Sequence, residues 1–114
     1  MQYIALIYGE EDPNFDFSSA EGKAMSEAYG AYTQKIIAAG QFKAGDALLP
    51  ASTATCVKKC NDKIVTTDGP FIESKEQLAG YYLLECADLD EAIKAASEIP
   101  HAANGTIEVR PIVQ

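Results

Sequence analysis

The sequence predicts a single α+β domain of 114 residues, in which an antiparallel sheet carries two helices on one side. Two stretches, residues 2–8 and 79–87, are apolar on both faces of an extended chain, which is typical of central strands. Helical patterns over about 19–39 and from Asp88 to Pro100 separate these strands from others. The order β-α-β, inserted hairpin, β-α-β predicts the split βαβ, or ferredoxin-like, fold.

Capping signals mark the start of both helices. Ser18 and Glu21 have capping-box spacing, and apolar residues then recur at helical spacing as far as Gly40: Met25, Tyr29, Tyr32, Ile36 and Ala39. Asp88 and Glu91 form a second capping box, before a helix with the expected buried stripe Leu89, Ala92, Ile93 and Ala96.

Two shorter strands complete the pattern. Residues 41–50 predict a strand that Gly45 breaks and Pro50 ends. Residues 106–113 alternate imperfectly between apolar and polar and predict the final strand.

A hairpin is expected between the two halves of the fold. Residues 54–60 and 63–68 flank Asn61-Asp62, two residues that tolerate the positive φ values of a primed turn. In this register Thr55 pairs with Asp68, which therefore closes the open end of the hairpin.

The two helices of such a fold cover only one face of the sheet. The apolar residues of 2–8 and 79–87 that point the other way need a partner, and a second copy of the same sheet supplies one. We therefore predict a homodimer joined sheet to sheet.

Charge and composition exclude several classes of protein. Nine basic and 17 acidic residues give a net charge of −8, and Arg110 is the only arginine, so nucleic acid is not expected as a partner. The apolar run 3–8 is too short for a signal peptide core or a membrane span, so we expect a cytoplasmic protein without membrane contact. Three cysteines and one histidine do not predict a disulfide framework or a zinc site, and we expect small buried thiols at Cys56 and Cys60.

The stretch Asp68-Gly69-Pro70-Phe71 forms an unusual exit from the hairpin. A turn aspartate usually accepts a hydrogen bond from the amide two residues on, but here that residue is Pro70, which has no amide hydrogen. The carboxylate of Asp68 must reach the amide of Phe71 or Ile72, or a group outside the loop. Asp68 is therefore either a local cap or a carboxylate available to a site.

Other polar and aromatic residues are candidates for the same site. Glu73 lies close to Asp68 in sequence, and neighbouring carboxylates supply an acid and a base. His101 is either a general base or an exposed bystander. Arg110 either clamps an anionic substrate or pairs at a sheet edge, and Tyr29 either lines a cleft or packs in the core.

Several segments resemble the YCII-related family, in its DGPF branch. The similarity covers Asp68 to Phe71, the following Glu73, and three longer stretches: MQYIALIYG at the start, GYYLLECADLDEA, and GTIEVRPI at the end. The resemblance implies a ferredoxin-like domain that pairs into a dimeric α/β barrel, with no cofactor. It also implies an active-site cleft beside the first helix and the motif loop.

The resemblance implies two kinds of function. A related enzyme of the YCII branch eliminates chloride from a chlorinated aromatic diol, and DGPF proteins are associated with extracytoplasmic-function sigma factors. The histidine of the YCII catalytic dyad would fall near Tyr29, and Asp46 lies in the neighbourhood of its acid. With no histidine on this helix, Asp68 or His101 is the expected substitute.

These observations give three hypotheses. The first is a small-molecule site with lyase-type acid–base chemistry, with Asp68 and His101 as catalytic residues and a binding set of Phe71, Glu73, Tyr29, Asp46 and Arg110. The second is a non-enzymatic regulatory or sensor module that acts with a sigma factor. The third is a purely structural dimer.

Overall fold

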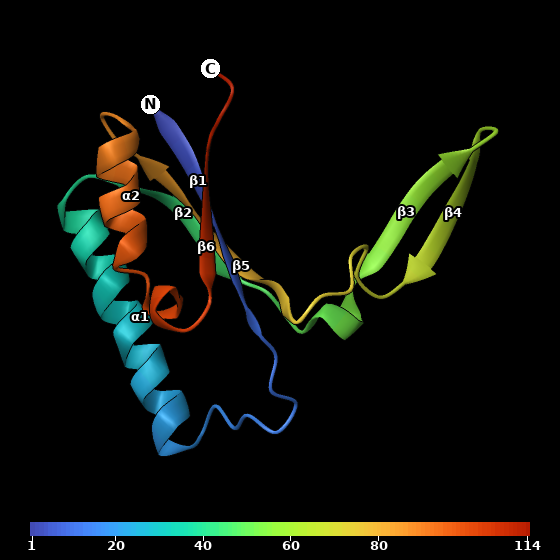
Figure 1. The fold of residues 1–114 in the computed structure, drawn as a ribbon, viewed down its shortest axis with the longest axis horizontal. Helices are drawn as coiled ribbons and strands as arrows, with labels where there is room; N and C mark the ends of the chain where they lie inside the picture. Colours follow the sequence, from blue (N-terminus) through green and yellow to red (C-terminus); the bar gives the residue numbers. More distant parts are fainter.

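A four-stranded antiparallel sheet forms the centre of the computed structural model, which describes residues 1–114 (Figure 1). Its strands are β1 (Gln2–Glu10), β2 (Phe42–Ala47), β5 (Glu76–Glu85) and β6 (Thr106–Pro111), in the spatial order β2-β5-β1-β6. Two helices, α1 (Ala20–Ala38) and α2 (Leu89–Ser97), lie on one side of it. This α+β arrangement is consistent with the predicted ferredoxin-like fold.

The central strands β1 and β5 provide the core on the helix side. Tyr3 lies opposite Leu84 and Ala5 opposite Tyr82, and all four side chains are buried. Side chains alternate along a strand, so this register places the whole row on one face. The buried residues that complete the core are Ile7, Tyr32, Ile36, Cys86, Ala92, Ala95, Ala96 and Ile99.

The other face of the sheet is open. Ile4 lies opposite Leu83 and Leu6 opposite Tyr81, and no helix covers them. These four side chains are only partly shielded. We call the row formed by Ile4, Leu6, Tyr81 and Leu83 the open face.

Helix α1 begins one residue later than the capping-box spacing predicts. The Ser19 hydroxyl, not that of Ser18, accepts the capping hydrogen bond from the amide of Gly22, at 3.1 Å. Ser18 instead donates from its amide and hydroxyl to the carboxylate of Asp16. This local turn occupies Ser18 and leaves Ser19 as the cap.

The predicted cap of α2 is confirmed, but the predicted stripe is partly wrong. Asp88 accepts a hydrogen bond of 2.9 Å from the amide of Glu91. Leu89 and Ile93 are about half exposed, whereas the residues buried against the sheet are Ala92, Ala95 and Ala96. A helix of nine residues packed closely on the sheet presents its small side chains there.

Strand β2 runs through Gly45 instead of breaking at it. Gly45 pairs with Tyr82, and a Cβ atom at Gly45 would lie 2.6 Å from the tyrosine ring. The glycine therefore gives the Tyr82 ring its space in the core. A short 3₁₀ turn, η1 (Ala51–Thr53), follows Pro50.

The hairpin consists of β3 (Thr55–Cys60) and β4 (Lys63–Asp68) and extends from the side of the sheet that lacks helices (Figure 1). Asn61 and Asp62 have the predicted positive φ values of 48° and 64°. Thr55 lies opposite Asp68, as predicted. We call residues 55–68 the arm. Cys60 is exposed near its tip, so the prediction of a buried thiol there is wrong, because nothing packs on this part of the arm.

A substitution at Gly40 tests how helix α1 ends. The glycine's φ of +73° and the hydrogen bonds from Gly40 to Ile37 and from Gln41 to Ile36 form a left-handed helix cap. Gly40→Ala should lower the free energy of unfolding by about 1 kcal/mol, because a Cβ atom strains this conformation. Gly30→Ala, inside the same helix and equally free of neighbouring atoms, should raise it by about 0.5–1 kcal/mol. Urea unfolding measures both, and equal effects of the two variants would contradict the assignment.

Candidate functional site

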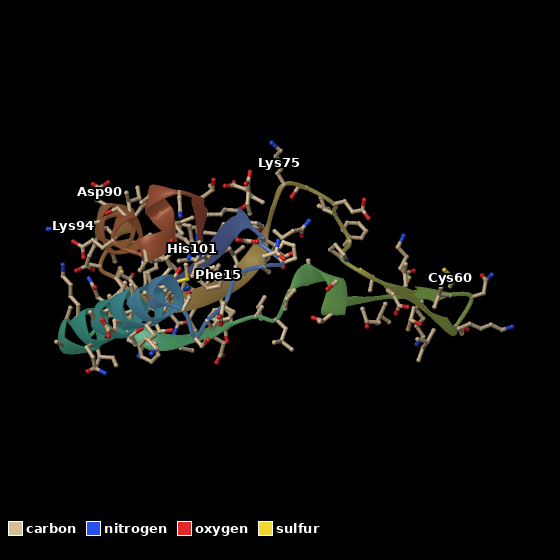
Figure 2. All side chains as sticks on the ribbon, turned by 90° about the horizontal axis from the view of Figure 1, so that it is seen from below. Phe15, Cys60, Lys75, Asp90, Lys94 and His101 are labelled. Atoms are coloured by element: carbon tan, nitrogen blue, oxygen red, sulfur yellow. The ribbon has the colours of Figure 1, made fainter.

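Tyr29 and His101 form a hydrogen-bonded pair between distant parts of the chain. Tyr29 projects from α1, and His101 belongs to the 3₁₀ turn η2 (Pro100–Ala103) that follows α2. The Tyr29 hydroxyl is hydrogen-bonded to Nδ1 of His101, and the two ring centroids are 5.6 Å apart. Both side chains are about half-buried, and Figure 2 shows His101 over the helical end of the molecule. The pair is therefore partly shielded from water while keeping access to the surface.

Gly9, near the end of β1, makes room for the imidazole. A Cβ atom at this position would lie 3.0 Å from Cδ2 and 3.5 Å from Nε2 of His101. The ring thus lies directly over the strand backbone. The chain also turns tightly between His101 and β6, because the amide of Gly105 donates a 2.7 Å hydrogen bond to the carbonyl of His101.

Burial sets the protonation of the pair. Desolvation raises the pKa of Tyr29 to about 12, although its hydrogen bond to His101 acts in the opposite direction. Desolvation also lowers the pKa of His101. At neutral pH the phenol therefore keeps its proton and the imidazole is uncharged.

A neutral pair of this kind can both give and take a proton. With the phenol donating to Nδ1, the hydrogen of the imidazole is on Nε2, which is then a hydrogen-bond donor. If the tyrosine oxygen accepts from Nδ1 instead, Nε2 has a free lone pair and acts as a base. Both forms are neutral, and a ligand that accepts from or donates to Nε2 would select between them.

Asp68, Phe71 and Glu73 lie elsewhere, at the base of the arm. The carboxylates of Asp68 and Glu73 make no hydrogen bond, so Asp68 does not reach the amides of Phe71 or Ile72. A backbone hydrogen bond closes the corner instead. The amide of Gly69, which has a φ of +96°, donates to the carbonyl of Ala54 at 2.8 Å. Asp68 is thus not a local cap, and its carboxylate is exposed.

The end of the motif segment meets the sheet. Thr106 donates a 2.8 Å hydrogen bond to the carboxylate of Glu76, the first residue of β5. A shallow hollow of about 460 Å³ lies beside this contact, and the residues that line it are Tyr8, Ser74, Lys75, Glu76, Thr106 and Glu108. A second hollow, of about 420 Å³, lies between α2 and β6 and also borders Thr106.

Asp46 and Arg110 lie on the sheet, at its two outer strands. The Tyr81 hydroxyl donates to Asp46 at 2.7 Å, and this hydrogen bond raises the pKa of Tyr81. Arg110 lies 3.8 Å from the carboxylate of Glu108 on the same strand, and both side chains are largely exposed. Arg110 is thus paired with Glu108 on its own strand, at the edge of the sheet.

The structure divides the predicted site residues into three groups. Tyr29 and His101 come together, whereas the motif residues and the sheet residues form no hydrogen bond or ion pair with them. Sequence reasoning missed Gly9 and the hydrogen bond between Tyr81 and Asp46. The signal for the latter was the strand register, since Asp46 and Tyr81 are directly opposite in the β2–β5 ladder.

No group of three or more histidine, cysteine or acidic side chains is placed to hold a metal ion. Neither helix combines the length and the apolar character that crossing a membrane requires.

The chain belongs to the YCII-related family, whose family model matches residues 1–114. It is also 34% identical over 114 residues to an uncharacterized protein from Rhizobium meliloti (strain 1021). This similarity covers 98% of the present chain and 92% of the relative.

The lowered pKa of His101 predicts a pH-dependent stability. The unfolded chain, in which histidine titrates near 6.5, binds a proton before the folded chain does, so the free energy of unfolding should fall as pH drops below about 6.5. Because His101 is the only histidine, its single imidazole signal in a proton NMR titration reports the folded pKa directly. A midpoint at or above 6.5 would contradict the burial argument. His101→Gln should remove this part of the pH dependence.

Proposed function

We propose that this YCII-related protein binds a small molecule and carries out acid–base chemistry on it at the Tyr29–His101 pair. The observation that supports this proposal is the hydrogen bond between the two rings in a half-buried position. A surface histidine with no hydrogen-bond partner to orient its ring would give no comparable support for acid–base chemistry.

The pair suits proton transfer to or from a neutral or anionic organic ligand. An uncharged imidazole avoids the cost of burying a cation, and its Nε2 atom is free of protein hydrogen bonds. A lyase-type elimination needs such a base to remove a proton while the leaving group departs. Tyr29, near which the resemblance places the histidine of the YCII branch, then orients the imidazole of His101.

The remaining predicted residues form no hydrogen bond or ion pair with Tyr29 or His101, and the proposal gives them no contact with a ligand at that pair. Asp68 and Glu73 offer carboxylates without intramolecular partners, and Phe71 offers an aromatic ring that is 77% exposed. Asp46 and Arg110 supply polar groups on the side of the open face. The Asp68 to Phe71 motif also supports assignment to the DGPF branch.

We further propose that the protein acts as a homodimer joined through the open face, in the manner of a dimeric α/β barrel. Ile4, Leu6 and Leu83 are large apolar side chains on a face that no helix covers. A second sheet packed at about 10 Å removes them from water. An apolar face of this kind on a monomer would favour aggregation.

The alternative is a regulatory module that acts with an extracytoplasmic-function sigma factor. The specific observation in its favour is the exposure of Phe71 and Ile72, at 77% and 66%, beside the motif. Such a module would need no proton transfer. It therefore predicts that Tyr29 and His101 are dispensable for function.

Ligand binding tests the proposed function. A thermal-shift screen with phenolic and carboxylated small molecules should give at least one compound that raises the melting temperature of the wild type. Tyr29→Phe and His101→Gln should reduce that affinity at least about tenfold, because each removes one half of the hydrogen-bonded pair. Tyr81→Phe is the matched control, since it removes a phenol that bonds only to Asp46. Asp68→Asn reports whether the motif carboxylate contributes.

Two results of that screen would contradict the proposal. If no compound shifts the melting temperature, the regulatory alternative is favoured. If Tyr81→Phe weakens binding as much as Tyr29→Phe does, the loss of affinity is not specific to the Tyr29–His101 pair.

The oligomeric state tests the proposed dimer. Size-exclusion chromatography with light scattering should give twice the mass of the 12.2 kDa chain. Leu6→Asp should raise the dissociation constant at least about tenfold, because it buries a charge between the sheets. Ile93→Asp changes a side chain on α2 that is 50% exposed and should leave the dimer intact. A monomeric wild type would refute the dimer.

A further inference from the structure

The arm has no partner within its own chain. Strands β3 and β4 are hydrogen-bonded only to each other, and every residue of the two strands except Cys56 is exposed. In Figure 2, Cys60 near the tip lies at the opposite end of the molecule from Lys94 on α2. A two-stranded hairpin is only marginally stable in water by itself. An arm of this length needs a surface to pack against.

One face of the arm is suited to such packing. Val57 lies opposite Thr66 and Ile64 opposite Lys59, so that Val57 and Ile64 share a face. These two side chains are 65% and 74% exposed. The other face carries Val65, which is 46% exposed. The face with Val57 and Ile64 therefore has the greater apolar area to bury.

The exposed surface of the whole chain is too large for a compact monomer. The chain exposes 8005 Å², whereas a monomeric protein of this mass exposes about 6,000 Å². Its radius of gyration is 16.0 Å, against about 13 Å for a compact domain. The difference in area exceeds the roughly 800 Å² per partner that a stable interface needs. The open face and the arm together account for such an interface.

The geometry brings a second copy within reach of the arm. The arm extends on the same side of the sheet as the open face (Figure 1). Six residues of strand span about 20 Å, and two packed sheets are about 10 Å apart. The arm is thus long enough to reach a second chain packed on the open face.

Charge also favours a second copy as the partner. The arm carries Lys58, Lys59 and Lys63 against Asp62 and Asp68, a net charge of +1, whereas the whole chain has a net charge of −8. Outside the arm, acidic residues therefore outnumber basic ones by a wider margin. Oppositely charged surfaces steer association and fix its orientation.

We propose that the β3–β4 arm of each copy packs against the other copy, with Val57 and Ile64 in contact with the partner. This inference rests on the proposed sheet-to-sheet dimer and adds a second, reciprocal contact to it. In a two-fold dimer each chain gives one arm and receives one. The arm is then a folded hairpin because the partner covers it.

Cross-linking from the arm tip tests the inference in the intact protein. Cys60 is an exposed thiol beside the turn, and a flexible benzophenone maleimide attached there can reach round the tip to the face of Val57 and Ile64, so it should give covalent dimers on irradiation. In an equal mixture of ¹⁵N-labelled and unlabelled chains, the cross-linked peptides should join heavy and light chains. The control places the label at Lys94→Cys in a Cys60→Ser background, on α2 at the other end of the molecule, and should give no such product.

Each outcome decides one of the two proposals. If light scattering shows a dimer but the Cys60 label joins only to its own chain or to none, the arm is free for another protein and the inference is overturned, while the dimer stands. A monomeric wild type overturns both. Heavy–light cross-links from Cys60 that are absent from the control support both.

A variant pair measures the contribution of the apolar face. Ile64→Asp should raise the dimer dissociation constant at least about tenfold in sedimentation equilibrium. Val65→Asp, on the opposite face of the same strand, should change it by less than about threefold. Equal effects of the two variants would overturn the assignment of the contacting face. The Cys60 cross-link, made in the wild type, does not depend on whether either variant folds.

Discussion

The pairing of β1 with β5 is the constraint on which the rest of the structure depends. Their register puts Tyr3 and Leu84 together under the helices and Ile4 and Leu83 together on the open face. Side chains alternate along both strands, and both rows are apolar, so a domain with helices on one side can bury only one of them. The helix layer, the position of the Tyr29–His101 pair and the uncovered open face all follow from this single ladder.

The Tyr29–His101 pair depends on the same ladder. Helix α1 packs on the buried row through Tyr32 and Ile36, which fixes the face on which Tyr29 lies. The 3₁₀ turn after α2 then returns His101 to the end of β1, where Gly9 leaves space for the ring. The pair thus joins the two βαβ halves of the fold. Its half-burial, and so the direction of both pKa shifts, is a consequence of helix packing.

Local signals predicted much of the fold and little of the site. The hairpin turn at Asn61-Asp62 and the Asp88 cap are short-range features, and the structure has both. The Ser18 cap was wrong because Asp16, two residues away, competes for the same hydroxyl. The pairing of Tyr29 with His101 spans 72 residues, so only the packed topology brings them together.

The corner Asp68-Gly69-Pro70 forms the exit of the chain from the arm. Pro70 offers no amide to Asp68, and the positive φ of Gly69 turns the chain out of β4 while its own amide closes the base of the arm on Ala54. The backbone therefore sets the direction in which the arm leaves the sheet. The Asp68 carboxylate is not needed for this turn, and it is exposed at the base of the arm without a hydrogen-bond partner in the chain.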